Sequence, residues 1–150
     1  MNLQEISDRF EIQDVVHHLV RGFDRRDWDT VEQLLADTVV MDYTAMLGGE
    51  VETRTAAEQT QHYRDQLDPL DATMHAATTL LVDLDGDSAT ASVNILSWLR
   101  REAAHDGPMW SNGSAGEIRL TRVADRWRIA GITVRPAWAE GNMGILDPAR

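Results

Sequence analysis

Two residue types, cysteine and lysine, are absent from this chain of 150 residues. Cysteine is absent, so the chain can form neither disulfide bonds nor thiolate metal sites. Lysine is absent too, and all basic side chains are arginines. The net charge of -11, without a basic cluster, argues against nucleic acid as a partner, because nucleic-acid binders neutralise phosphates with grouped Lys and Arg.

Long apolar runs are also missing. No segment approaches the roughly 20 apolar residues that cross a bilayer, so we expect no contact with a membrane. The first thirty residues lack the apolar run of a signal peptide, and a soluble cytoplasmic protein is the expectation. The length suits one domain, residues 1–150, with a core of its own.

Aromatic residues are few, yet tryptophan dominates them, with five Trp beside two Phe and two Tyr. Flat aromatic surfaces suit an apolar small-molecule pocket, and Trp98, Trp110 and Trp138 are candidates for its lining. The alternative for each tryptophan is ordinary packing in the core or at an interface.

Motifs for metals, nucleotides and hydrolase triads are absent. The chain has no His-x-x-x-His or comparable ligand spacing, which predicts no metal site. It has no glycine-rich loop after a strand, which predicts no nucleotide cofactor, and no Gly-x-Ser-x-Gly elbow. The chemistry that remains is acid–base chemistry without a cofactor.

Hydrophobic spacing predicts helices in the first half of the chain. Asp27 and Thr55 stand where side chains cap helices, and Thr55 forms a capping box with Glu58 three residues later. Pro69 ends the last of these helices. The predicted elements are helices at Leu3–Phe23, Trp28–Ala36 and from Thr55 to Leu67, with a short strand at Val39–Tyr43.

From Thr73 the pattern changes to strands. Tight turns at Asp85-Gly86 and Ala124-Asp125 join two pairs of them. Helices followed by a meander of antiparallel strands predict an α+β fold. The predicted strands are Met74–Leu84, Ser88–Arg101, Trp110–Val123 and Trp127–Val134.

Short sequence frames along almost the whole chain carry a family resemblance. They are Glu11-Ile12-Gln13-Asp14, Phe23-Asp24, Asp27-Trp28-Asp29, Met41-Asp42-Tyr43, Thr73-Met74-His75, Asp85-Gly86-Asp87 and Arg126-Trp127-Arg128-Ile129-Ala130-Gly131. In this order they resemble the SnoaL-like group of the nuclear transport factor 2-like superfamily, which includes polyketide cyclases, scytalone dehydratase and hexachlorocyclohexane dehydrochlorinase. The resemblance implies a cone-shaped α+β barrel, in which N-terminal helices pack on a strongly curved, mostly antiparallel sheet that encloses a cavity.

The resemblance also implies roles for four residues. Asp24 falls where the dehydratase and the dehydrochlorinase keep the aspartate that orients their histidine. His75 falls where both keep that histidine, the general base. Tyr43 matches a tyrosine that helps bind and polarise the dehydratase's substrate, and Phe23 stands where that enzyme has a second such tyrosine.

Other positions depart from the dehydratase. Its second catalytic histidine would fall near Leu99 and its late-strand asparagine near Gly116, so this chain does not match a scytalone dehydratase. Ser114 does match a substrate-contacting serine of that enzyme, and Asn112 lies on the same strand face. The alternative reading of this polar stretch is a bend of the sheet at its glycines.

Strand alternation places His75, Ala77, Thr79 and Leu81 on one face, where small neighbours leave space in front of the imidazole. A carboxylate bonded to Nδ1 would fix the tautomer and leave Nε2 facing a cavity. The alternatives are structural: a buried histidine with a structural partner, and Asp24 as a former of the turn after its helix. Tyr43 likewise offers a donor to a substrate oxygen or serves as a core tyrosine.

We therefore expect a cofactor-independent acid–base enzyme of the cyclase, dehydratase or isomerase type, acting on a largely apolar or polyketide-like small molecule. His75 is the expected base and Tyr43 the oxygen-polarising donor. A non-catalytic module of the same fold, for ligand binding or dimerisation, is the alternative. A homodimer through the open sheet face is expected, because helices cover only one side of the sheet. The histidines at positions 17, 18 and 62 are expected at the surface.

Overall fold

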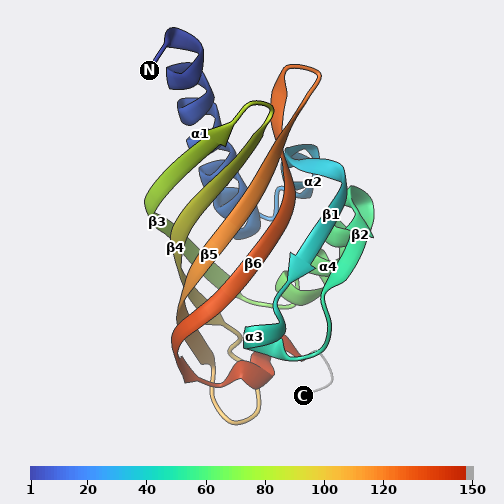
Figure 1. Cartoon of the computed structure of the whole chain (residues 1–150). Coiled ribbons are helices and arrows are strands. Elements are labelled where there is room, and N and C mark those ends of the chain that lie inside the picture. Colours follow the sequence, from blue (N-terminus) through green and yellow to red (C-terminus); the bar gives the residue numbers. More distant parts are fainter. Residues whose placement is uncertain (148–150) are drawn as a thin grey trace.

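The computed structural model describes residues 1–147, and most of its helices precede its long strands (Figure 1). This order confirms the α+β class. None of the helices within residues 1–147 is long and apolar enough to cross a membrane. In chain order the elements are α1 (Leu3–Arg25), α2 (Trp28–Leu34), β1 (Leu35–Asp42), α3 (Thr44–Leu47), β2 (Glu52–Thr55), α4 (Ala56–Leu67), β3 (Ala72–Asp85), β4 (Ser88–Arg100), β5 (Met109–Val123), β6 (Arg126–Gly141) and the 3-10 turn η1 (Met143–Leu146).

The six strands form one mixed sheet that is not closed, in the order β2-β1-β6-β5-β4-β3. Only β1 and β6 pair in parallel, whereas the other neighbours are antiparallel. The long strands β3 to β6 run side by side in Figure 1, with α1 behind them and α4 behind β1 and β2. Helix α1 packs on β3 and β6, and α4 packs on β1, β2 and α2. The sheet therefore has one face under helices and one open face.

Side-chain caps fix the ends of the two main helices. Thr55 and Glu58 form the predicted capping box at the start of α4, and Asn2 forms a second one with Glu5 at the start of α1. Helix α1 ends at Arg25, and the next residue, Arg26, caps it with a left-handed φ of 56° and an N–H that donates to the carbonyls of the last turn. Asp24 lies in that last turn.

Some predicted boundaries are wrong. Helix α2 ends at Leu34 rather than Ala36, because Leu35 pairs with Ile129 of β6 and is buried as the first residue of β1. Strand β6 runs past Val134 to Gly141, because its last residues pair with the start of β5. The short elements α3, β2 and η1 were not predicted at all.

A β-bulge in the edge strand β3 also differs from the prediction. Pairing with β4 shifts between Thr78 and Leu81, and Thr79 adopts a φ of 51°. The inward positions change there from His75 and Ala77 to Leu80, which packs on the core. Leu81 is 66% exposed, so it does not share the face of His75. The bulge lets the first half of β3 line one part of the interior and the second half another.

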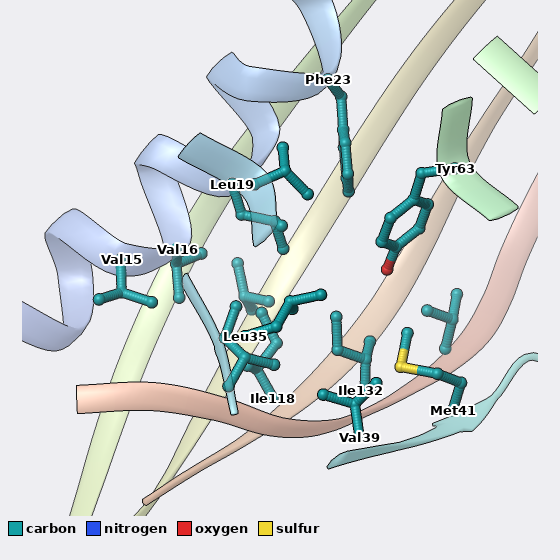
Figure 2. Close-up of a cluster of buried hydrophobic side chains, with 14 of the residues drawn as sticks. Val15, Val16, Leu19, Phe23, Leu35, Val39, Met41, Tyr63, Ile118 and Ile132 are labelled. Atoms are coloured by element: carbon teal, nitrogen blue, oxygen red, sulfur yellow. The ribbon is translucent and has the colours of Figure 1, made fainter. Parts of the chain in front are cut away.

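The core lies between the helices and the inner face of the sheet. Figure 2 shows Val16 and Leu19 of α1 directed toward the strands that carry Ile118 and Ile132. Helices α1 and α2 approach closely at Gly22, where a Cβ would lie 2.7 Å from Val31 Cγ2. This packing holds the C-terminal half of α1 against the sheet, and the functional residues of α1 lie in that half.

Candidate active site

A cavity of about 260 Å³ lies between the helices and the inner face of the sheet. That volume is near the lower end for small-molecule pockets. Exposed residues from the stretch before β2 line one side, so the cavity opens to solvent there. The apolar wall includes Leu19, Phe23, Met41, Leu67, Ile118 and Val134. The polar groups in its interior include Tyr43, Gln59, Tyr63, His75, Ser97, Asn112 and Ser114.

Asp24 and His75 are in direct contact beside this cavity, as predicted. His75 Nδ1 lies 2.7 Å from Asp24 Oδ1, and the backbone N–H of His75 donates to Oδ2 at 2.8 Å. The hydroxyl of Thr73 donates to Oδ1 at 2.9 Å. Since an ionised carboxylate only accepts hydrogen bonds, Nδ1 carries the proton and Nε2 keeps its lone pair.

The carboxylate is held as an anion by its donors. Burial raises the pKa of Asp24, but the hydrogen bonds from His75 and Thr73 outweigh burial and leave the pKa below its ordinary value. Arg26 donates to the Thr73 oxygen at 2.8 Å, which directs the hydroxyl proton of Thr73 toward Asp24. The side chains of Asp24 and His75 are only 19% and 11% exposed. The pair is therefore a shielded imidazole–carboxylate unit.

Two phenols meet on the other side of the cavity. The hydroxyl oxygens of Tyr43 and Tyr63 are 3.3 Å apart, and burial raises the pKa of both. Both are therefore neutral hydrogen-bond donors at neutral pH. Phe23 packs beside Tyr63, with ring centroids 4.6 Å apart (Figure 2). The ring of Phe23 also lies 5.5 Å from that of His75, centroid to centroid. Tyr63 was not predicted as a site residue, because its helical spacing is equally typical of a core residue.

Strand β5 contributes the remaining polar groups. Asn112 and Ser114 are buried on its inner face, and the Ser114 hydroxyl donates to Asn112 Oδ1 at 3.2 Å. Trp110 is buried on the same face and lines the cavity. Within residues 1–147 no three His, Asp or Glu side chains are grouped as a metal site.

The comparisons with known proteins agree with this fold. Residues 4–133 match the model of the SnoaL-like domain. The chain belongs to this family. The crystal structure of the Kfla4162 protein from Kribbella flavida is 23% identical to this SnoaL-like domain, with a TM-score of 0.88 over 95% of this chain and 98% of that one. None of the curated proteins matches.

Two further solved structures are similar at lower identity. A hexachlorocyclohexane dehydrochlorinase, LinA type 2, is 15% identical, with a TM-score of 0.80 over 96% of this chain and 95% of that one. A Novosphingobium aromaticivorans protein provisionally assigned as a scytalone dehydratase is 12% identical, with a TM-score of 0.82 over 95% and 92% of the chains. At these identities the similarity shows the nuclear transport factor 2-like fold, which confirms the resemblance in the sequence.

Two tryptophans predicted to line the pocket of this SnoaL-like domain lie on the open face of the sheet instead. Trp98 is 39% exposed and alternates with the buried Ser97 and Leu99. Trp138 is 43% exposed and covers Gly113, where a Cβ would lie 2.3 Å from the indole Nε1. Gly113 is thus required for the close approach of Trp138. Trp98 and Trp138 are therefore not part of the cavity lining, in contrast to the prediction.

The histidines of the helices divide into two groups. His17 and His18 are exposed on α1, as expected. His62 of α4 is half-buried and lines the cavity, so the surface prediction is wrong for it. Burial and the charge of Arg54 lower the pKa of His62. His62 is therefore part of the polar rim of the cavity in this SnoaL-like domain, on the side where Arg54 lies.

Proposed function

We propose that this SnoaL-like domain is a cofactor-independent acid–base enzyme of the cyclase, dehydratase or isomerase type. Its substrate is a largely apolar or polyketide-like small molecule. The observation that carries the proposal is the 2.7 Å contact of Asp24 with His75 at the wall of an apolar cavity. Within residues 1–147, Nε2 of His75 makes no hydrogen bond, so its lone pair is free to accept a proton.

The proposed reaction begins with proton abstraction next to a substrate carbonyl. Nε2 of His75 takes the proton, and the carboxylate of Asp24 stabilises the resulting imidazolium. The electron pair of the broken C–H bond moves toward the carbonyl oxygen, which accepts a hydrogen bond from Tyr43. Asn112 and Ser114 hold a polar group of the substrate, and Phe23 and Trp110 contact its apolar body. The apolar wall keeps water from the charged intermediate.

Three outcomes share this first step. Loss of a leaving group from the next carbon completes an elimination, with the imidazolium returning its proton to that group. Attack of the carbanion on a second carbonyl closes a ring, and the imidazolium returns its proton to the alkoxide that this forms. Return of the proton to another carbon of the conjugated system completes an isomerisation. The names of two similar structures, a dehydrochlorinase and an assigned dehydratase, support elimination.

The proposal is tested by hydrogen exchange at carbon. Wild-type protein in D₂O is incubated with a panel of aromatic and β-oxygenated ketones, and deuterium incorporation is followed by mass spectrometry. We expect incorporation into at least one compound, and its loss in His75→Gln. Exchange that is unaffected by His75→Gln would rule out this residue as the base.

A non-catalytic ligand-binding module is the second candidate. Trp110 and Met41 leave about 260 Å³ open beside His75, a volume that a ligand-binding module and an enzyme both need. The contact of Asp24 with His75 at the wall of this cavity is the observation that supports the enzyme. A co-purifying small molecule that wild-type protein binds but does not change would favour the module instead.

We also propose that a second copy of this chain covers the open face of the sheet. Met74 of β3 pairs across the strands with Trp98 of β4, and Trp138 lies two strands away on the same face. These three side chains are 65%, 39% and 43% exposed, an apolar patch that a monomer would leave in water. Light scattering at tens of micromolar should give a dimer mass, and Trp98→Asp should give a monomer. A monomeric wild type would contradict the proposal.

A further inference from the structure

Four polar side chains follow one another along the wall of the cavity. Nη1 of Arg54 donates to Oε1 of Gln59 at 2.9 Å. Gln59 lies one helical turn before Tyr63 on α4, and its side chain lowers the pKa of Tyr63, as a hydrogen-bond donor does. Tyr63 in turn lies 3.3 Å from Tyr43, oxygen to oxygen. All four residues line the cavity, and Gln59 is 1% exposed.

The chemistry of the first residue fixes the direction of the series. A guanidinium only donates, so the amide oxygen of Gln59 faces Arg54 and its NH₂ group faces Tyr63. The phenol oxygen of Tyr63 then accepts from Gln59, and its own proton points to the oxygen of Tyr43. This arrangement leaves the proton of Tyr43 free for a ligand in the cavity.

We propose that Arg54, Gln59 and Tyr63 are positioning residues, which polarise Tyr43 into the hydrogen-bond donor for a substrate carbonyl oxygen. This inference rests on the proposed function and adds three residues to it. Hydrogen bonds that run in one direction strengthen one another in a low dielectric, and the cation at the start of this series adds to that effect. The donor group is therefore the whole series rather than a single phenol.

Burial is the main cause that raises the pKa of both phenols, so each is a neutral hydrogen-bond donor at neutral pH. Gln59 and Arg54 act against burial at Tyr63. The other titratable side chains that line the cavity are Glu50, Glu52, His62 and His75, and Glu52 pairs with Arg54.

A titration without any substrate tests the direction. The chain has only two tyrosines, so labelling with 3-fluorotyrosine gives two ¹⁹F resonances, and Tyr43→Phe and Tyr63→Phe assign them. Fluorine lowers the pH at which the phenols titrate. In Tyr63→Phe we expect Tyr43 to titrate at a higher pH than in the wild type, because it loses a donor. In Tyr43→Phe we expect Tyr63 to titrate at a lower pH, because its proton loses an acceptor.

A matched pair of glutamine variants tests the middle of the series. Gln59→Glu keeps an acceptor for Arg54 but removes the N–H that Tyr63 accepts, so Tyr43 should titrate at a higher pH than in the wild type. Gln61→Glu places the same charge on the exposed side of α4 and should leave both resonances nearly unchanged. Equal shifts in the two glutamine variants would overturn the proposed role of Gln59.

The directions of these shifts in titration pH test this inference separately from the proposed function. The direction is wrong if Tyr43 titrates at the same pH or a lower pH in Tyr63→Phe than in the wild type. It is also wrong if Tyr63 titrates at a higher pH in Tyr43→Phe. In either case Tyr63 is the donor to the cavity. If the signs are as expected but no compound exchanges deuterium, the series stands and the proposed function fails. With an exchanging substrate, Tyr63→Phe should lower kcat about tenfold with little change in KM.

Discussion

Asp8 and Asp24 lie near opposite ends of helix α1 and each accepts three hydrogen bonds, but their surroundings suit the two carboxylates to different roles. Asp8 is 5% exposed and accepts from Arg122 Nη2 at 2.7 Å, Trp127 Nε1 at 3.1 Å and Gln4 Nε2 at 3.0 Å. None of these donors loses its proton near neutral pH. Asp8 does not line the cavity, and its contacts join the start of α1 to β5 and β6.

Asp24 accepts the same number of hydrogen bonds, but one donor is an imidazole that lines a cavity. An imidazole can exchange its proton near neutral pH, and here Asp24 fixes which nitrogen does so. The number of hydrogen bonds therefore does not distinguish a structural carboxylate from a functional one. What distinguishes Asp24 is that one of its donors is a titratable side chain that lines a cavity.

The largest expected effect follows from removing the imidazole. His75→Ala should lower the rate of deuterium exchange or turnover roughly 100- to 10,000-fold, because a positioned general base contributes that much. His105 is a matched control, since its side chain is 85% exposed in a loop, and His105→Ala should keep the wild-type rate. Steady-state kinetics and thermal unfolding check both variants. Equal rates for the two alanine variants would contradict the role of His75.

Asp24→Asn should lower the rate nearly as much as His75→Ala, by up to about 10,000-fold, because the tautomer that it favours has no lone pair at Nε2. An asparagine has one acceptor oxygen, whereas Asp24 accepts through both of its oxygens. The amide therefore cannot serve the backbone N–H and Nδ1 of His75 together, and the proton moves to Nε2. Kinetics and circular dichroism test this expectation. If Asp24→Asn reacts at the wild-type rate, Asp24 only forms the turn after helix α1 and does not orient His75.

Asp8→Asn should do the opposite, costing stability without changing the rate. The hydrogen bond from Arg122 lowers the pKa of Asp8 to about 2, against the raising effect of burial. A pKa lowered from 3.8 to about 2 corresponds to about 2 kcal/mol of folding stability at neutral pH. The sign is that of a depressed carboxyl: the stability is present above pH 4 and is lost as the pH falls toward 2.

Urea unfolding of Asp8→Asn and the wild type between pH 7 and pH 2 measures this difference. The gap between the two curves should shrink as the pH falls, because the wild-type carboxylate becomes protonated. A gap that stays constant over this range would show that packing, and not the charge of Asp8, makes the contribution. A loss of rate in Asp8→Asn would remove the distinction between the two carboxylates.

The sequence alone predicted the fold class and the contact of Asp24 with His75, because both follow from the short sequence frames that resemble the SnoaL-like group. Alternation along a strand predicted the inner face of β5, and the same rule, applied to Trp98 between Ser97 and Leu99, would have placed that tryptophan outside. The bulge at Thr79 was not predictable, since threonine gives no signal for a left-handed φ. The alternation of residues along a strand predicts which side chains face inward only where no bulge interrupts the strand.

Tyr63 shows a different limit of the sequence. Its spacing on α4 places it on the buried side, but a contact with Tyr43 requires α4 and the end of β1 to meet across the cavity. Such a contact between distant segments has no local signature. Leu35 illustrates the same point, because its pairing with Ile129 of β6 ends helix α2 where no stop signal exists.

The smallest expected effect belongs to the phenols. Tyr43→Phe keeps the ring and removes one donor, and removal of one donor to a developing oxyanion costs roughly 100- to 1,000-fold when nothing replaces it. Here the hydroxyl of Tyr63 lies 3.3 Å from that of Tyr43, and loss of its acceptor frees its proton for the substrate oxygen. We therefore expect a loss of only about tenfold, measured as kcat with the exchanging substrate. The double variant Tyr43→Phe with Tyr63→Phe should lose more than the product of the two single losses, because neither phenol can then replace the other. If Tyr43→Phe alone costs as much as His75→Ala, Tyr63 does not substitute, and the donor and the base contribute equally to the reaction.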